Sequence, residues 1–118
     1  MFDIILNKIK ECTDNRVLTR PYEVSGECVI VKLEPQAYDN GVCTSRLEIL
    51  CIAKSYERAL LSFDKISQGL DELSTEENEV LDIDLESTVI KYDTVSGMTR
   101  LMGVFSAYTE VGYDDIEE

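Results

Sequence analysis

The side chains best suited to chemistry are carboxylates that alternate along one short segment, Asp82, Asp84 and Glu86. Oxygen ligands of this kind suit a hard cation such as Ca²⁺ or Mg²⁺, and carboxylates alone can act as general acid and base. Alternate residues of a strand point to one face, however, and in most proteins a face of this composition is exposed to water. We therefore interpret the three carboxylates as a solvated acidic surface in preference to a cation site.

Histidine is absent from the 118 residues, which removes the commonest general base, triad partner and metal ligand. The four cysteines are Cys12, Cys28, Cys43 and Cys51, and they include no C-x-x-C pair on which a zinc site could be built. Three of them lie in or beside apolar segments, so we expect free thiols that pack as small hydrophobic residues. The six glycines form neither G-x-G-x-x-G nor G-x-x-x-x-G-K. We therefore predict no enzymatic activity, no metal and no cofactor.

Negative charge is concentrated in the second part of the chain. The formal net charge is −13; residues 1–70 hold nine Lys and Arg against ten Asp and Glu, whereas residues 71–118 hold two against fourteen. Such a surface repels phosphate, so tight sequence-independent binding of DNA or RNA is improbable. It would suit a protein past which DNA slides without being held, and it would equally serve solubility alone.

The length and composition fit one compact domain, because 118 residues with 44% hydrophobic content can bury a sizeable core. We assign residues 1–111 to a single α+β domain and residues 112–118 to a short acidic tail. No run approaches the roughly 20 apolar residues of a membrane span, and Met1–Lys10 is unlike a secretory signal. We expect a soluble, cytoplasmic protein that does not associate with membranes.

The clearest structural signal is a strand that leads directly into a helix within Ser45–Leu73. In Arg46–Lys54, one face of the strand carries Leu47, Ile49, Cys51 and Ala53. Leu50 and Ile52 add apolar bulk to the other face, as expected of a central strand that is covered on both sides. Ser55 is the expected N-cap of the helix. Helical spacing then places six residues on one stripe of this helix: Tyr56, Ala59, Leu60, Phe63, Ile66 and Leu70.

The remaining elements are weaker but sufficient to predict a topology. An amphipathic helix occupies the N-terminus and ends near Thr13, and residues 16–26 form a connecting arm with a short extended piece at Val17–Tyr22. Strands are predicted at Glu27–Glu34, Arg46–Lys54, Leu81–Leu85, Thr88–Tyr92 and Arg100–Val111. A longer loop, Gln36–Cys43, joins the first two of these strands. The predicted fold is a mixed or antiparallel sheet of about five strands with two helices packed on it, in the order α-β-β-α-β-β-β.

Four segments carry a resemblance to a known family. They are the helix around Ile9, CVIVKLE at Cys28–Glu34, LEILCIAKSYERAL at Leu47–Leu60, and RLMGVFSAYTEV at Arg100–Val111. In this pattern the chain resembles small tailed-phage morphogenesis proteins described as minor capsid proteins, which are similar to the tail terminators of long-tailed phages. The resemblance spans most of the chain and lies in the pattern of elements, without a catalytic signature.

The resemblance implies a structural role. Members of such a family assemble as rings, usually hexameric, on the end of a completed tail tube and join it to the head. The implied partners are further copies of the chain, the tail tube and the head connector, and DNA passes through the ring without being bound. The implied location is the host cytoplasm during assembly and the head–tail junction of the virion afterwards.

Two groups of residues follow as candidates for this role. The candidate acidic surface toward the lumen consists of Glu76, Glu77, Glu79, Asp82, Asp84 and Glu86. The candidate interface residues are Tyr38, Asn40, Tyr92, Phe105 and Tyr108. The interface elements are expected to be sheet edges formed by Thr88–Tyr92 or Arg100–Val111, together with the loops Gln36–Cys43 and Ser74–Glu79.

Two other classes of protein stay open at this point. A head-side neck or connector adaptor would share the size and the acidity of a tail terminator. A small ligand-binding, nucleotide-handling or regulatory protein would instead require an apolar pocket with converging carboxylates.

Overall fold

The computed structural model describes residues 2–20, 26–76 and 79–110. Within these ranges it contains two helices and five strands: α1 (Phe2–Cys12), β1 (Arg16–Leu18), β2 (Cys28–Asp39), β3 (Val42–Ala53), α2 (Tyr56–Glu76), β4 (Val80–Asp93) and β5 (Met98–Glu110). The five strands form a single sheet in the order β1-β2-β3-β5-β4. Strands β1 and β2 are parallel, and every other neighbouring pair is antiparallel.

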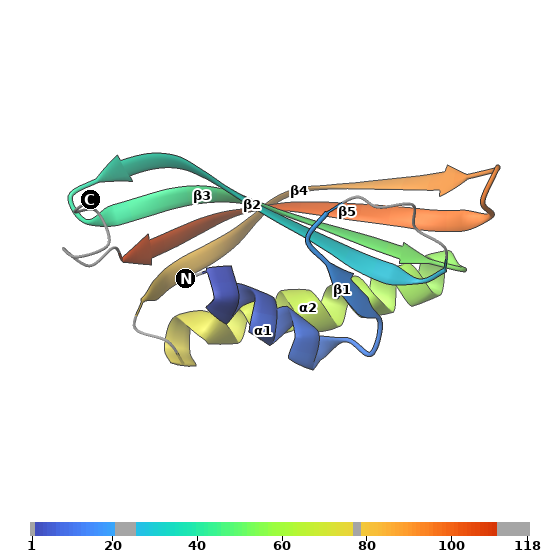
Figure 1. The fold of residues 1–118 in the computed structure, drawn as a ribbon, viewed down its shortest axis with the longest axis horizontal. Helices are drawn as coiled ribbons and strands as arrows, with labels where there is room; N and C mark the ends of the chain where they lie inside the picture. The colour runs from blue at the N-terminus through green and yellow to red at the C-terminus, as the bar shows by residue number, and fades with distance from the viewer. Residues whose placement is uncertain (1, 21–25, 77–78, 111–118) are drawn as a thin grey trace.

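The two helices lie on the same side of the long, twisted sheet (Figure 1). This arrangement confirms the predicted α+β single domain with a five-stranded mixed sheet and two helices. We call the helix-bearing side the covered face and the opposite side the open face. Neither described helix is both long and apolar enough to cross a membrane.

The order of elements differs from the prediction at two places and is α-β-β-β-α-β-β. Leu81–Leu85 and Thr88–Tyr92, predicted as two strands, belong to the single strand β4. The pairing of β4 with β5 shifts between Leu85 and Ser87, and this bulge interrupts the side-chain alternation while the strand continues. The fifth strand is instead β1, a three-residue piece within the predicted connecting arm.

The predicted hairpin of β2 and β3 is confirmed, but the prediction of a longer loop is wrong. Pairing extends as far as Asp39 with Val42, so only Asn40 and Gly41 form the turn. Both residues have positive φ, 51° and 80°. A two-residue turn of this backbone geometry matches the twist of the flanking strands, and an Asn-Gly pair adopts it readily.

The junction of β3 and α2 is held by two polar contacts. The Ser55 hydroxyl accepts a hydrogen bond from the backbone N–H of Arg58 at 3.2 Å, which confirms Ser55 as the N-cap. The Arg58 guanidinium donates two hydrogen bonds to the carboxylate of Glu27, with Nε to Oε2 at 2.6 Å. Glu27 also accepts the backbone N–H of Lys54 at 3.0 Å. One carboxylate therefore ties the residue before β2 to the start of α2.

The core lies between the covered face and the helices. The inward stripe of α2 buries Ala59, Phe63, Ile66, Leu70 and Leu73, and α1 adds Ile5 and Ile9. The Phe63 ring lies over Gly103 of β5, where a Cβ atom would overlap it. It also packs on Phe105, with ring centroids 5.8 Å apart. Glycine at position 103 thus allows the helix to approach the sheet closely.

Candidate interaction surfaces

Three of the predicted acidic residues, Asp82, Asp84 and Glu86, lie along the first half of β4. Asp82 and Asp84 pair with Tyr108 and Ser106 of β5, and Glu86 falls at the bulge. The pKa of Asp84 is raised above its ordinary value because its carboxyl shares a hydrogen bond with Asp82. Desolvation and the negative charges nearby act in the same direction. These carboxylates therefore form one local cluster of negative charge on an exposed strand.

The other predicted acidic residues add less to this cluster. Glu79 precedes β4, where its side chain is exposed and its carbonyl accepts the backbone N–H of Glu110 at 2.7 Å. Glu76 ends α2, which extends into the predicted loop Ser74–Glu79. The side chain of Glu76 and the whole of Glu77 lie outside the described part of the chain.

The structure offers little that resembles a ligand site. Among the described residues no group of three or more His, Cys, Asp or Glu side chains is arranged to hold a metal ion. A hollow of about 460 Å³ lies where the end of α1 meets α2. Its charged lining consists of Glu11, Asp14, Glu27, Arg58 and Lys65. The Arg58 guanidinium lowers the pKa of Glu27 to about 2, so this carboxylate is already committed to a structural ion pair.

All four cysteines are free thiols in the structure. Cys51 lies on the covered face, and burial raises its pKa to about 12. Burial also raises the pKa of Cys28. Because the thiolate is the reactive form, these two cysteines act as packing residues, not as nucleophiles.

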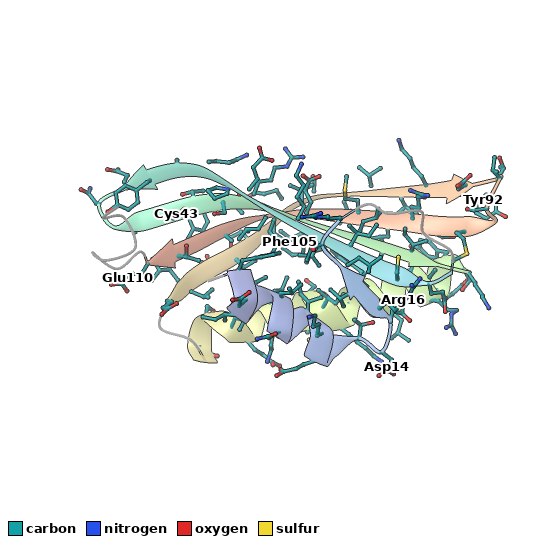
Figure 2. The ribbon with its side chains drawn as sticks, in the orientation of Figure 1. Asp14, Arg16, Cys43, Tyr92, Phe105 and Glu110 are labelled. Carbon is teal, nitrogen blue, oxygen red and sulfur yellow. The ribbon has the colours of Figure 1, made fainter. Side chains whose placement is uncertain are left out.

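Most of the predicted interface residues lie on the surface but far from one another. Tyr38, half exposed, and Asn40 lie at the tip of the β2–β3 hairpin. Tyr92 is 64% exposed and lies at the opposite end of the sheet (Figure 2). Tyr108 is half-buried on the open face, between Thr44 and Asp82. With principal extents of 47 × 26 × 22 Å, the molecule presents these residues as separate surfaces and not as one patch.

Two of the interface predictions are wrong. Phe105 is only 2% exposed, because its side chain points to the covered face and packs on Phe63 (Figure 2). Over its described residues, 100–110, the segment Arg100–Val111 is not a sheet edge, since β5 lies between β3 and β4. Both errors have the same cause: the alternation within one strand shows neither where that strand lies in the sheet nor which of its faces is covered by the helices.

Strand β4 is the long edge of the sheet, in accord with the predicted edge at Thr88–Tyr92. Exposed large apolar residues gather on it: Leu81, Leu85, Val89, Ile90 and Tyr92. The acidic first half of β4 contains both of its register shifts, whereas the pairing from Ser87 to Asp93 is regular. Charged side chains and bulges ordinarily keep an edge strand from pairing with another chain. The second half of β4 is therefore the part of this edge that is less protected against such pairing.

The sequence prediction missed the organisation of the open face. One residue from every strand forms an apolar row in register across it: Leu18, Ile30, Leu50, Met102 and Val89. The next row toward the start of β2 carries a positive charge on three strands, and we call Arg16, Arg100 and Lys91 the basic row. The other two members of this row, Cys28 and Ile52, are buried. The apolar residues are partly exposed, Val89 by 49%. The signal for this surface was present in Leu50 and Ile52, which predicted a strand covered on both sides.

Comparison with known proteins gives a likeness of fold. No family model matches the sequence, and no curated protein matches it. The fold is similar to that of one chain in the virion of a native gene transfer agent particle. The TM-score is 0.59 with 13% sequence identity, and the match covers 91% of this chain and 84% of the other.

Proposed function

We propose that this protein is a structural component of a phage-like virion, and that it acts there as a tail terminator. In this role several copies form a ring that caps the tail tube and joins it to the head. The observation that carries the proposal is the likeness of fold to a chain of a gene transfer agent virion over 91% of this chain. The four segments that resemble tail terminators add independent support from the sequence.

The surfaces of the molecule agree with assembly more than with catalysis. The charged groups around the hollow between α1 and α2 include the Glu27–Arg58 ion pair, which links the start of β2 to the start of α2. By contrast, the apolar row is partly exposed, and the second half of β4 exposes Val89, Ile90 and Tyr92. Exposed apolar surface of this kind usually marks contact with another protein.

Negative charge supports the passage of DNA without retention. The net charge is −13, and the cluster at Asp82, Asp84 and Glu86 is exposed and unfavourable to phosphate. We place this cluster toward the lumen of the proposed ring. A ring of six copies follows from the resemblance, and its partners would be the tail tube on one side and the head connector on the other.

The test is a capping experiment. Purified tail tubes that lack their terminator are mixed with the protein and imaged by electron microscopy. The proposal predicts a ring at one end of each tube and arrest of tube growth. Failure to bind tubes, combined with binding to the portal end of DNA-filled heads, would assign the protein to the head side as an adaptor. Binding to neither would contradict a role in the neck.

A variant pair separates tube binding from the lumen role. Replacing both Asp82 and Asp84 with Lys is expected to preserve capping, because the lumen cluster does not contact the tube. It is expected to reduce the number of infectious or transducing particles, because DNA is then retained in the ring. The matched control replaces both residues with Asn, which removes charge without adding any, and it should reduce particle yield less.

A further inference from the structure

We propose that the open face of each copy is covered by the outward side of α2 from the neighbouring copy. The contact would be head to tail, with two different surfaces of the same chain meeting at every junction. This inference rests on the proposed ring and names the surfaces that build it.

The composition of the open face is suited to packing against a helix. Its apolar row runs across all five described strands, and Arg100 and Lys91 border it on one side. On the other side Lys32 lies opposite Glu48 and 3.8 Å from the Glu34 carboxylate, so the positive charge is confined to one border. On the covered face the same sheet buries its apolar residues under α2 and α1. A sheet with apolar residues on both faces is ordinarily packed on both.

The outward side of α2 has the complementary composition. Residues at alternating intervals of four and three share one straight stripe of the helix, and all of them are exposed: Glu57, Leu61, Asp64, Gln68 and Asp71. Leu61 is 58% exposed and is flanked on the stripe by Glu57 and Asp64. None of the three carboxylates forms an ion pair within the described part of the chain.

The acidic stripe of α2 and the cations beside the apolar row have complementary charges, which favours a second copy of this chain as the partner that covers the open face. Seating Leu61 on the apolar row brings the flanking carboxylates beside Lys91 and Arg100, of which Arg100 also lies 3.9 Å from the Asp93 carboxylate at an exposed position. The stripe carries three negative charges and no positive one, so it fits this surface better than a basic or neutral helix would. The result is a layer of sheet with helices on both sides, one set supplied by each copy.

The proposed contact also has the symmetry that a ring needs. Because the stripe and the open face are different surfaces, each copy uses one to bind the copy ahead and the other to bind the copy behind. Such a contact generates a closed ring or a filament, whereas a contact between two identical surfaces stops at a dimer.

The test is a complementation experiment with two charge-reversed variants. The open-face variant carries Lys91→Glu and Arg100→Glu, and the stripe variant carries Glu57→Lys and Asp64→Lys. Each alone is expected to raise the dissociation constant for self-association at least about tenfold, as sedimentation velocity over a protein concentration series would show. A chain with all four changes restores opposite charges across the contact and should recover to within about threefold of the wild-type constant.

Mixing the two variants gives the sharper result. In an equimolar mixture an intact stripe meets an intact open face at one junction, and a reversed stripe meets a reversed open face at the next, so the mixture should assemble with alternating copies although neither variant assembles alone. The matched control, Lys10→Glu with Lys54→Glu, changes the net charge by the same amount as the open-face variant at exposed positions outside the contact, and it should associate as the wild type does. Circular dichroism confirms that each variant is folded.

Three outcomes would overturn the proposal. They are a wild-type protein that stays monomeric at all concentrations, an open-face variant that associates as well as the wild type, and a chain with all four changes that fails to recover. The measurement contains no tail tubes, so it is separable from the proposed function. A protein that passes it but caps no tube would contradict the terminator role and leave the contact standing.

Discussion

The two faces of the sheet use the same five strands and differ in how far their apolar residues are buried, although Cys28 and Ile52 of the open face are buried too. On the covered face Leu101 is 1% exposed, and Phe63 fills the space that Gly103 leaves free. On the open face the next residue along β5, Met102, stays partly exposed in a row of apolar neighbours. The alternation of a strand supplies both faces with hydrophobic residues, but the two helices cover only one.

This difference separates what holds the chain together from what it offers to others. Burial on the covered face lowers the free energy of the folded monomer. The same kind of side chain on the open face contributes to stability only when another molecule removes it from water. The comparison therefore predicts that substitutions on the covered face destabilise the fold, while those on the open face weaken assembly.

The largest expected effect is at the contact between Phe63 and Gly103. Phe63→Ala should lower the free energy of unfolding by about 3–5 kcal/mol, since it removes a buried ring and leaves a cavity. Gly103→Ala should lower it by about 1–3 kcal/mol, because the added Cβ overlaps that ring. Urea unfolding of the two single variants and the double variant provides the measurement.

The double variant makes the test specific. With the ring of Phe63 removed, the methyl group introduced at position 103 keeps only a tight contact with the Phe105 ring, at 3.2 Å, so Gly103→Ala should be clearly less destabilising in that background. If the two changes in the free energy of unfolding simply add in the double variant, α2 does not approach β5 closely at this point.

The second prediction compares adjacent residues of β5. Leu101→Ala should lower the free energy of unfolding by about 2–5 kcal/mol, because Leu101 is buried in the core. Met102→Ala removes a side chain of similar size from the open face and should change the free energy of unfolding by less than about 1 kcal/mol. In self-association the ranking should reverse, with Met102→Ala weakening the assembly. Equal destabilisation by both variants would contradict the distinction between the faces.

The smallest effect is expected from Glu27, whose contacts lie at the rim of the covered side. Replacing it with Gln should lower the free energy of unfolding by about 1 kcal/mol at neutral pH, because Arg58 and the Lys54 N–H lose their charged acceptor. The folded-state pKa of about 2 lies below the ordinary value of 4.5. The stabilisation is therefore complete above about pH 4.5 and disappears as the pH falls toward 2.

Denaturant unfolding of wild type and Glu27→Gln across that pH range tests the sign. The two proteins should converge in stability as the pH approaches the folded-state pKa of about 2. A difference that stays constant over the whole range, or that grows, would show that the ion pair is not the source of the shift.

Local signals predicted most of the fold. Hydrophobic spacing identified both helices, and Ser55 marked the start of α2. Alternation located β2, β3 and β5. It failed where a local irregularity resembled a boundary: the bulge between Leu85 and Ser87 was interpreted as a break between strands. The three-residue strand β1 is too short to show any period.

The surfaces were harder to predict because they depend on pairing. Phe105 was assigned to an interface since β5 alternates without revealing which side faces the helices; the pairing of Phe105 with Leu47 of β3 places it in the core. The acidic cluster on β4 was predictable, because Asp82 and Asp84 alternate along one strand. For the apolar row, Leu50 indicated only that one strand is covered on both sides. The row itself was not predictable, because its five members come from five separate strands.

The most direct test of the whole account is the size of the assembled protein. Native mass spectrometry of the wild-type chain, over a concentration series, should detect one discrete closed ring, six copies of the 13.4 kDa chain being the expected number. A closed ring follows because each copy has one open face and one outward stripe, and closure leaves neither exposed. A monomer at every concentration, or a dimer that never grows, would contradict the account.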